Sequence, residues 1–126
     1  MGQTTGFLTK SLTATTAIPA RTLVKFGAAD GAGVPAVDAA AFIFGVSGDI
    51  DTAVGERCSV HSIGNIADVV YGGTVTRGAA LTADANGKAV ATTTAGAFIV
   101  GYAEVSGVSG DIGTVIVAPG RYAAAA

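Results

Sequence analysis

The two side chains with the most reactive chemistry, Cys58 and His61, are three positions apart in a predicted strand, residues 57–63. Side chains alternate between the two faces of a strand, so residues three apart point to opposite faces. A Cys–His catalytic dyad is therefore not expected, and the pattern predicts a buried thiol and a histidine at the rim. One cysteine and one histidine also cannot hold zinc without several carboxylates.

Acidic residues gather in one predicted loop, where Asp49 and Asp51 are followed by Glu56. A calcium loop of the EF-hand type needs an oxygen ligand where Ala53 stands and a glycine where Val54 stands. The segment is better interpreted as an exposed acidic loop, and we expect no metal site there.

Motifs for nucleophilic catalysis and nucleotide binding are missing from the sequence. Ser47 and Ser109 each follow a glycine by two positions, but neither completes the G-x-S-x-G elbow that exposes a catalytic serine. The glycines form neither G-x-G-x-x-G nor a P-loop. We therefore predict that the chain is not an enzyme and that it uses no metal, cofactor or small-molecule substrate.

The composition favours a protein made in the cytoplasm, with neither a nucleic acid nor a membrane as its partner. The 126 residues include 7 Lys and Arg and 9 Asp and Glu, for a net charge of −2, so the basic face that nucleic acids require is missing. No apolar run approaches the ~20 residues of a membrane-spanning helix. Only 13% of the residues are charged, so small apolar side chains must cover much of the surface. Such a surface is normally covered by other protein, which predicts an oligomer or a subunit of an assembly.

Short segments rich in Val, Ile, Phe and Thr alternate with turn residues, which is typical of an all-β fold. Asp30-Gly31 and Asn86-Gly87 favour tight turns. We expect a small β-barrel or β-sandwich over residues 19–122. The predicted strands are residues 22–26, 41–46, 57–63, 66–71, 88–91, 98–105 and 114–118.

An internal repeat relates two parts of the chain. A shift of 56 residues aligns residues 21–46 with residues 77–102 without a gap. Residues 55–60 likewise resemble residues 110–115. A short hairpin-based unit is marginal by itself, so we expect the two units to close one barrel or sandwich together.

Residues 1–18 are interpreted as an extended N-terminal arm, because they are rich in Thr, Ser and Gly and show no sustained hydrophobic period. Phe7 and Leu8 have nothing nearby in sequence to pack against. They are either anchors that insert into a groove of a partner or an incidental exposed pair. At the other end, residues 123–126 form an alanine tail.

The other aromatic residues fall into two groups. Phe42, Phe44 and Phe98 lie in predicted strands and are expected in the core. Tyr71 and Tyr102 are expected at the edge of the core or in an interface.

Five segments of the chain are each uninformative alone, but their order and spacing together resemble a known family. They are residues 21–31 (RTLVKFGAADG), 42–46 (FIFGV), 64–90 (GNIADVVYGGTVTRGAALTADANGKAV), 97–102 and 109–120 (SGDIGTVIVAPG). In this order and spacing they resemble the capsid cement, or head decoration, proteins of tailed phages. The resemblance implies a β-barrel-like protein that sits as homotrimers on the outer surface of the expanded head. There it would bridge neighbouring major capsid proteins and stabilise the shell.

The resemblance also implies that the N-terminal arm binds the major capsid protein. Candidate contact residues in the arm are Gly2, Thr4, Phe7, Leu8, Lys10 and Leu12. Candidate trimer or rim contacts are Tyr71, Arg77 and Tyr102.

Two other classes of function stay open at this point. A receptor- or carbohydrate-binding β-module on a virion or cell surface usually exposes aromatic platforms, whereas this chain has no Trp and three Tyr. A small hydrolase or lyase subunit would need a partner chain to supply the missing acid–base groups.

Overall fold

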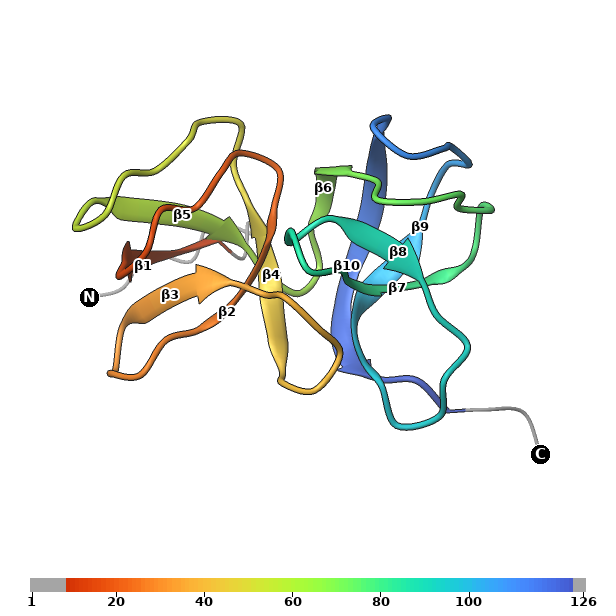
Figure 1. Ribbon diagram of the computed structural model, residues 1–126, viewed down its shortest axis with the longest axis horizontal. Coiled ribbons are helices and arrows are strands. Elements are labelled where there is room, and N and C mark those ends of the chain that lie inside the picture. Colours follow the sequence, from red (N-terminus) through yellow and green to blue (C-terminus); the bar gives the residue numbers. More distant parts are fainter. Residues whose placement is uncertain (1–8, 124–126) are drawn as a thin grey trace.

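The computed structural model describes residues 9–123, which form ten β-strands and no helix (Figure 1). The predicted all-β class is confirmed. No helix in this part of the chain is long and apolar enough to cross a membrane. In chain order the strands are β1 (Thr9–Ala14), β2 (Leu23–Phe26), β3 (Ala32–Pro35), β4 (Ile43–Ser47), β5 (Arg57–His61), β6 (Ile66–Val70), β7 (Ala80–Ala83), β8 (Ala89–Ala91), β9 (Phe98–Ala103) and β10 (Ile112–Arg121).

The strands form two five-stranded units that lie side by side (Figure 1). Repeat 1, residues 9–61, is a closed barrel in the order β1-β3-β2-β4-β5, with β5 paired back to β1. Repeat 2, residues 66–121, is a sheet in the order β6-β10-β9-β7-β8. When β1 to β5 are matched in turn with β6 to β10, neighbouring strands in one repeat correspond to neighbouring strands in the other. The chain is a structural duplication, as the internal repeat predicted, but the predicted gapless register is wrong over residues 21–26. Val24 corresponds to Leu81, a shift of 57, whereas Gly45 corresponds to Gly101, a shift of 56, so repeat 2 is one residue shorter between these positions.

Loop hydrogen bonds match the two repeats residue by residue. Ala14 N donates to Glu56 O (2.9 Å) in repeat 1, and Tyr71 N donates to Asp111 O (2.9 Å) in repeat 2. Gly55 N donates to Ala14 O (2.7 Å), and its counterpart Gly110 N donates to Tyr71 O (2.8 Å). Ile18 N donates to Thr52 O (2.9 Å), and its counterpart Val75 N donates to Gly107 O (2.8 Å). These bonds place Ala14 opposite Tyr71 and Glu56 opposite Asp111, and the counterparts named below follow from this register.

The two repeats differ at one seam. In repeat 1, β1 and β3 pair in parallel and close the barrel, with Thr13 N donating to Gly31 O at 2.7 Å. In repeat 2 the counterpart strands β6 and β8 are joined by an isolated bridge between Tyr71 and Ala89 rather than by a ladder. Repeat 2 is therefore open where repeat 1 is closed.

Residues 21–23 of repeat 1 occupy the open seam of repeat 2. Val70 N, at the end of β6, donates to Arg21 O at 3.2 Å, and Leu23 N donates to Gly87 O in the β7–β8 turn at 2.9 Å. Val70 N and Gly87 O are the counterparts of the two groups that bond to each other in repeat 1. A peptide of repeat 1 thus satisfies backbone groups that would otherwise lack a partner, and each such bond contributes about 1 kcal/mol.

The hydrophobic core crosses the boundary between the repeats. Leu23, Ile43 and Val46 of repeat 1 are fully buried and belong to one cluster with the interior of repeat 2. A second cluster, which includes Leu12 and Val60, fills repeat 1 alone. Of the expected barrel or sandwich closed by both units, the shared barrel is wrong, because repeat 1 closes by itself. Repeat 2, in contrast, is completed by repeat 1.

Strand β1 corrects the predicted domain boundary at residue 18. It pairs antiparallel with β5 from Thr9/His61 to Thr13/Arg57, and both Leu12 and the following Ile18 are buried. The barrel domain therefore begins by residue 9. The strand escaped sequence analysis because only two of its six residues are buried, which leaves no alternation to detect. The strands β3 and β7 were missed for a related reason, since they consist of Ala, Gly, Val, Pro, Leu and Thr in short runs.

Tyr71 fills the centre of repeat 2. Its side chain is fully buried, and its hydroxyl donates to Val105 O at 2.6 Å. A Cβ added at Gly107 would lie 2.8 Å from the ring, and one added at Gly113 would overlap it. In repeat 1 the counterparts of Tyr71, Gly107 and Gly113 are Ala14, Thr52 and Cys58. One large side chain and two glycines in repeat 2 thus replace three smaller side chains, an exchange that preserves packing.

We predict that Gly113→Cys, which installs the residue of repeat 1, lowers the free energy of unfolding by about 1–3 kcal/mol, because it collides with the Tyr71 ring. Tyr71→Ala alone lowers it by about 3–5 kcal/mol through the cavity that it leaves. In the double variant the two losses are less than additive, because each change relieves the other. Urea unfolding followed by circular dichroism measures all three, with Gly120→Ala as a near-neutral control since nothing lies near its added Cβ. Strict additivity would contradict this packing.

Burial raises the pKa of the Tyr71 hydroxyl above its ordinary value of 10.0, and the negative charge of Glu104 raises it further. The folded protein then holds this proton more tightly than the unfolded chain does. Its contribution to stability is complete below pH 10 and falls as the pH rises from 10 through the higher folded pKa. We predict that Tyr71→Phe removes this part of the alkaline loss of stability, measured as thermal midpoints from pH 8 to 11. Tyr102→Phe, at an exposed tyrosine, is the control, and an equal flattening in both variants would contradict the assignment.

Candidate interaction surfaces

The structure keeps Cys58 and His61 apart, as predicted. In β5 the buried and exposed positions alternate, so Cys58 faces the interior of repeat 1 while His61 is half-buried. The Cys58 thiol lies 3.7 Å from Ser59 O, and His61 Nδ1 lies 3.4 Å from Thr9 Oγ1. Among residues 9–123, no acid–base partner that would activate either side chain is hydrogen-bonded to it.

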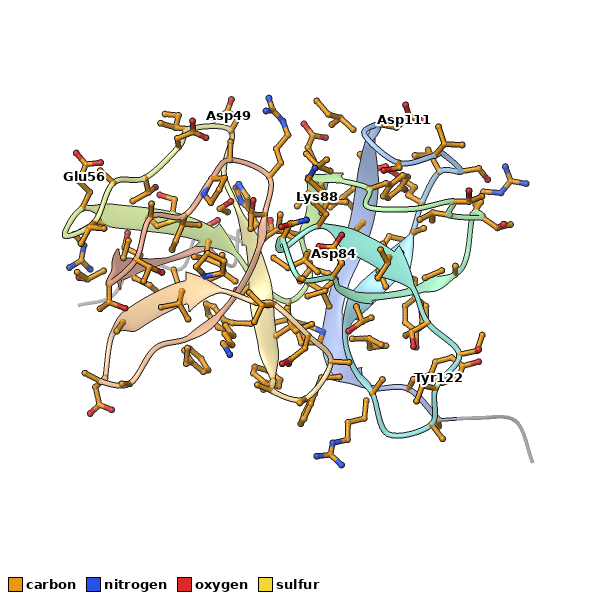
Figure 2. All side chains as sticks on the ribbon, viewed as in Figure 1. Asp49, Glu56, Asp84, Lys88, Asp111 and Tyr122 are labelled. Carbon is orange, nitrogen blue, oxygen red and sulfur yellow. The ribbon has the colours of Figure 1, made fainter. Side chains whose placement is uncertain are left out.

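Two carboxylates of the acidic loop accept hydrogen bonds from backbone N–H groups, one in the segment before β2 and one within the loop. Asp51 Oδ1 accepts from Ala20 N at 2.8 Å, and Glu56 Oε1 accepts from Ala53 N at 3.0 Å. Asp111 does the same in the matching loop of repeat 2. Within residues 9–123 there is no group of three His, Cys, Asp or Glu side chains placed to hold a metal ion. These carboxylates are structural, and Figure 2 shows Asp49, Glu56 and Asp111 along one edge of the molecule.

A polar cleft of about 270 Å³ lies between the repeats, lined by Arg21, Asp49, His61 and Asp68 among others. Arg21 has a left-handed backbone (φ 54°), and its counterpart in repeat 2 is Gly78 (φ 91°). A non-glycine residue in this conformation costs about 1–2 kcal/mol. The Arg21 Nε is buried without a hydrogen-bond partner. The lining combines one arginine and one histidine with two aspartates, so the cleft is not lined by charge of one sign.

Four phenylalanines form an aromatic patch that crosses the boundary between the repeats: Phe26, Phe42, Phe44 and Phe98. The Phe26 ring centroid lies 6.1 Å from that of Phe42 and 4.8 Å from that of Phe44, and Phe42 meets Phe98 edge-on at 6.3 Å. The Arg121 guanidinium sits 4.3 Å from the Phe98 centroid. Phe26 is 50% exposed and Phe42 is 40% exposed.

The aromatic patch corrects the prediction for Phe42, which lies at the surface instead of in the core. Phe44 and Phe98 are only partly buried. Next to the patch, an apolar pocket of about 170 Å³ is lined by Phe42, Phe44, Ser62, Ile63 and Pro119. The β2–β3 turn, the start of β4 and the end of β10 lie on the edge opposite the acidic loops (Figure 1). One edge of the molecule is thus acidic and the other aromatic.

A second apolar surface lies on the outside of repeat 2. Ile66, Ile116 and Tyr102 are neighbours across β6, β10 and β9, with Ile66 opposite Ile116 and Ile116 opposite Tyr102. Their side chains are 60%, 44% and 43% exposed. We call these three residues the outer row. Aromatic and β-branched cross-strand neighbours stabilise a sheet, but an exposed row of this kind also offers a surface to a partner.

The predicted arm residues do not form one group. Lys10 is exposed on β1, whereas Leu12 is 1% exposed and packs in the core of repeat 1, so it is unavailable to a partner. Gly2, Thr4, Phe7 and Leu8 lie outside the described residues. The first described residue, Thr9, is paired with His61 of β5.

The three predicted trimer or rim contacts, Tyr71, Arg77 and Tyr102, differ in exposure. Tyr71 is fully buried, so its assignment as a contact is wrong, because its ring fills the space left by two glycines. Arg77 is exposed in the loop before β7, where its backbone N donates to Ser106 Oγ at 2.9 Å. Tyr102 is exposed in the outer row. The sequence did not point to Ile66, Ile116 or Phe26 as surface residues. An apolar residue in a strand has the same sequence pattern whether it is buried or exposed.

The fold and these surfaces define a structural module: a duplicated all-β protein whose apolar groups lie partly at its surface. The profile of the phage cement protein family matches residues 2–118, and the chain belongs to this family. The predicted family is confirmed. It is a family of phage structural proteins, so this is a capsid-associated protein of the virion.

One solved structure is similar over nearly the whole chain. It is the head fiber gp8.5 N base of bacteriophage phi29, with a TM-score of 0.67, 18% sequence identity, and coverage of 89% of this chain and 94% of that chain. At this identity the likeness concerns the fold. No curated protein matches the chain.

We predict that His61→Ala and Cys58→Ala leave binding to phage heads unchanged, because in the described part of the chain neither side chain is hydrogen-bonded to a partner that would give it a chemical role. Cys58→Ala lowers stability by about 1 kcal/mol through lost packing, whereas His61→Ala is nearly neutral. Cosedimentation with heads measures binding, and thermal unfolding measures stability. Complete loss of binding by a folded His61 variant would show that this residue has a functional role.

Proposed function

We propose that this protein is a capsid decoration protein that binds the outer surface of the expanded phage head as homotrimers. In this role it bridges neighbouring major capsid proteins and stabilises the shell against internal pressure. In this proposal the protein acts by binding and covering surface of the shell, without catalysing a reaction. The major capsid protein is the proposed partner, and nucleic acid, membrane and small-molecule substrate take no part.

The observation that carries the proposal is the aromatic patch on the edge away from the acidic loops. Phe26 and Phe42 are 50% and 40% exposed in a chain whose aromatic residues amount to only 6%. Fully burying a phenylalanine side chain contributes about 1.5–3 kcal/mol, so this edge gains free energy when another protein covers it. Arg121, stacked on Phe98, adds a positive charge beside the patch.

The N-terminal segment supplies the second proposed contact with the shell. It leads into β1, whose first residue, Thr9, pairs with His61. In the proposal Phe7 and Leu8 are the anchors, Gly2 and Thr4 belong to the same segment, and exposed Lys10 flanks it. Leu12 has no place in this contact because it is a core residue.

Repetition explains how modest contacts can stabilise a shell. A trimer presents three patches and three N-terminal segments, so binding of the second and third takes place at high effective concentration. Overall attachment then exceeds that of a single contact by orders of magnitude.

The test is to mix purified protein with expanded, undecorated heads and to measure bound copies by sedimentation and cryo-electron microscopy. The expected result is saturable density at three-fold and quasi-three-fold positions on the outer surface. If the folded protein does not bind, the decoration proposal fails. A screen of the same protein against immobilised glycans then decides whether the receptor- or carbohydrate-binding alternative takes its place.

We predict that deleting residues 2–8 abolishes or strongly weakens head binding while the protein stays folded, since the deletion ends before β1. Phe7→Ala and Leu8→Ala each weaken binding by about 1–3 kcal/mol per subunit. Ile50→Ala, at a side chain 74% exposed in the acidic loop, is the matched control and leaves the binding isotherm unchanged. Full binding by the deletion variant would mean that the N-terminal segment is not the anchor.

A further inference from the structure

The two repeats of one chain meet through surfaces that do not correspond to each other. Repeat 1 contributes residues 21–23 and the side chain of Val46, whereas repeat 2 contributes the end of β6 and the β7–β8 turn at Gly87. Such a contact is head-to-tail: one repeat presents a donor surface and the other an acceptor surface. Because the chain is a duplication, repeat 2 also carries a counterpart of the donor surface, and repeat 1 carries a counterpart of the acceptor surface.

The counterpart of the donor surface, on repeat 2, is partly uncovered: Ala80, which matches Leu23, is 5% exposed, but the positions around it are open. Val46 is fully buried against repeat 2, while Tyr102 at the matching position is 43% exposed. Thr22, whose methyl group approaches Gly87 closely, corresponds to the half-buried Ala79. Arg77, two residues before Ala79, is exposed.

The counterpart of the acceptor surface, on repeat 1, is uncovered as well. The turn at Asn86-Gly87 corresponds to Asp30-Gly31, and both of the latter residues are exposed. The position of Ala83, which is buried in the shared core, is taken in repeat 1 by Phe26, which is 50% exposed. A hollow lined by Phe26 and residues 27–31 opens on this surface.

The two uncovered surfaces are complementary in charge and in polarity. Arg77 carries a positive charge at the rim of the donor counterpart, and Asp30 carries a negative charge at the rim of the acceptor counterpart. Tyr102 and Phe26 supply an exposed apolar group on each side. Opposite charges at the rim of an apolar contact steer two partners into register.

We infer that these surfaces bind each other between copies: the Arg77–Tyr102 surface of one chain docks on the Phe26–Asp30 surface of the next. The neighbouring copy then covers Phe26, and the contact with the capsid is made by Phe42 and the N-terminal segment. The occupant of each is a second copy of this chain, placed as repeat 1 is placed on repeat 2 within the chain. A heterologous contact of this kind closes into a ring when its rotation allows. The number of copies, three, rests on the proposed function, and closure then gives a ring of six repeats.

The contact between copies differs from the internal one in a single respect. The seam of repeat 1 is already closed by the bond from Thr13 N to Gly31 O, so no peptide inserts there. Side chains at the surface carry the contact between copies. The contact between copies therefore forms and separates without opening the barrel of repeat 1.

The test is chemical cross-linking of exposed cysteines, with the protein free in solution and bound to expanded heads. Arg77→Cys and Asp30→Cys proteins are mixed and treated with a short bis-maleimide, whereas buried Cys58 stays unreactive. The expected result is a covalent dimer in the mixture and none in either single variant alone. A double variant carrying both cysteines gives products up to three chains and none longer.

The control pairs Arg77→Cys with Glu56→Cys, because Glu56 lies on the acidic edge of the molecule (Figure 2). Equal cross-linking of the control pair, cross-linking of one single variant with itself, or products longer than three chains would each overturn the inference. A folded Tyr102→Glu variant adds an independent measurement: it is expected to elute at a smaller size than the wild type, and an unchanged size contradicts the inference.

The same experiment separates failure of this inference from failure of the proposed function. Head binding without cross-links, in solution or on heads, overturns the head-to-tail contact and leaves the decoration role in place. Cross-links in solution without head binding support the contact and overturn the decoration role.

Discussion

The structure depends on the insertion of three residues of one repeat into the seam of the other. Arg21 O and Leu23 N bond to Val70 N and Gly87 O of repeat 2. In repeat 1 the counterparts of these two groups bond to each other and close the barrel. Because Leu23 is also fully buried there, the same few atoms pair the backbone, fill the core and fix the orientation of the repeats. The aromatic patch, which crosses from repeat 1 to Phe98 of repeat 2, depends on this junction.

Sequence reasoning reached the all-β class, the duplication and the family because these depend on features that the chain displays openly. The turn dipeptide Asp30-Gly31 recurs as Asn86-Gly87, and short β-branched runs lie between the turns. The strand β1 could not be recognised, since its outward positions hold Thr, Lys and Ser and its two buried side chains are Leu12 and Ala14. Its pairing with β5, more than 40 residues away along the chain, and with β3 shows it to be a strand.

The interaction surfaces were harder to predict for a related physical reason. A phenylalanine in a strand is apolar whether it faces the core or a partner, so Phe42 reads as core in sequence and lies at the surface in the structure. Tyr71 is the reverse case: a polar tip favours an interface, but Gly107 and Gly113 make room for the ring and Val105 O satisfies the hydroxyl. Burial of a side chain is a property of its distant neighbours, which a local pattern does not contain.

The asymmetry of the seam sets a direction for folding. Repeat 1 contains both sides of its own closure, so it can close as soon as residues 9–61 have left the ribosome, before repeat 2 exists. Repeat 2 then finds residues 21–23 already held in place and folds against them, which shortens its search for non-local strand pairs. The gene order of the two repeats is thus also their order of folding, and a circular permutation that moved repeat 2 to the N-terminus would expose its open seam during synthesis.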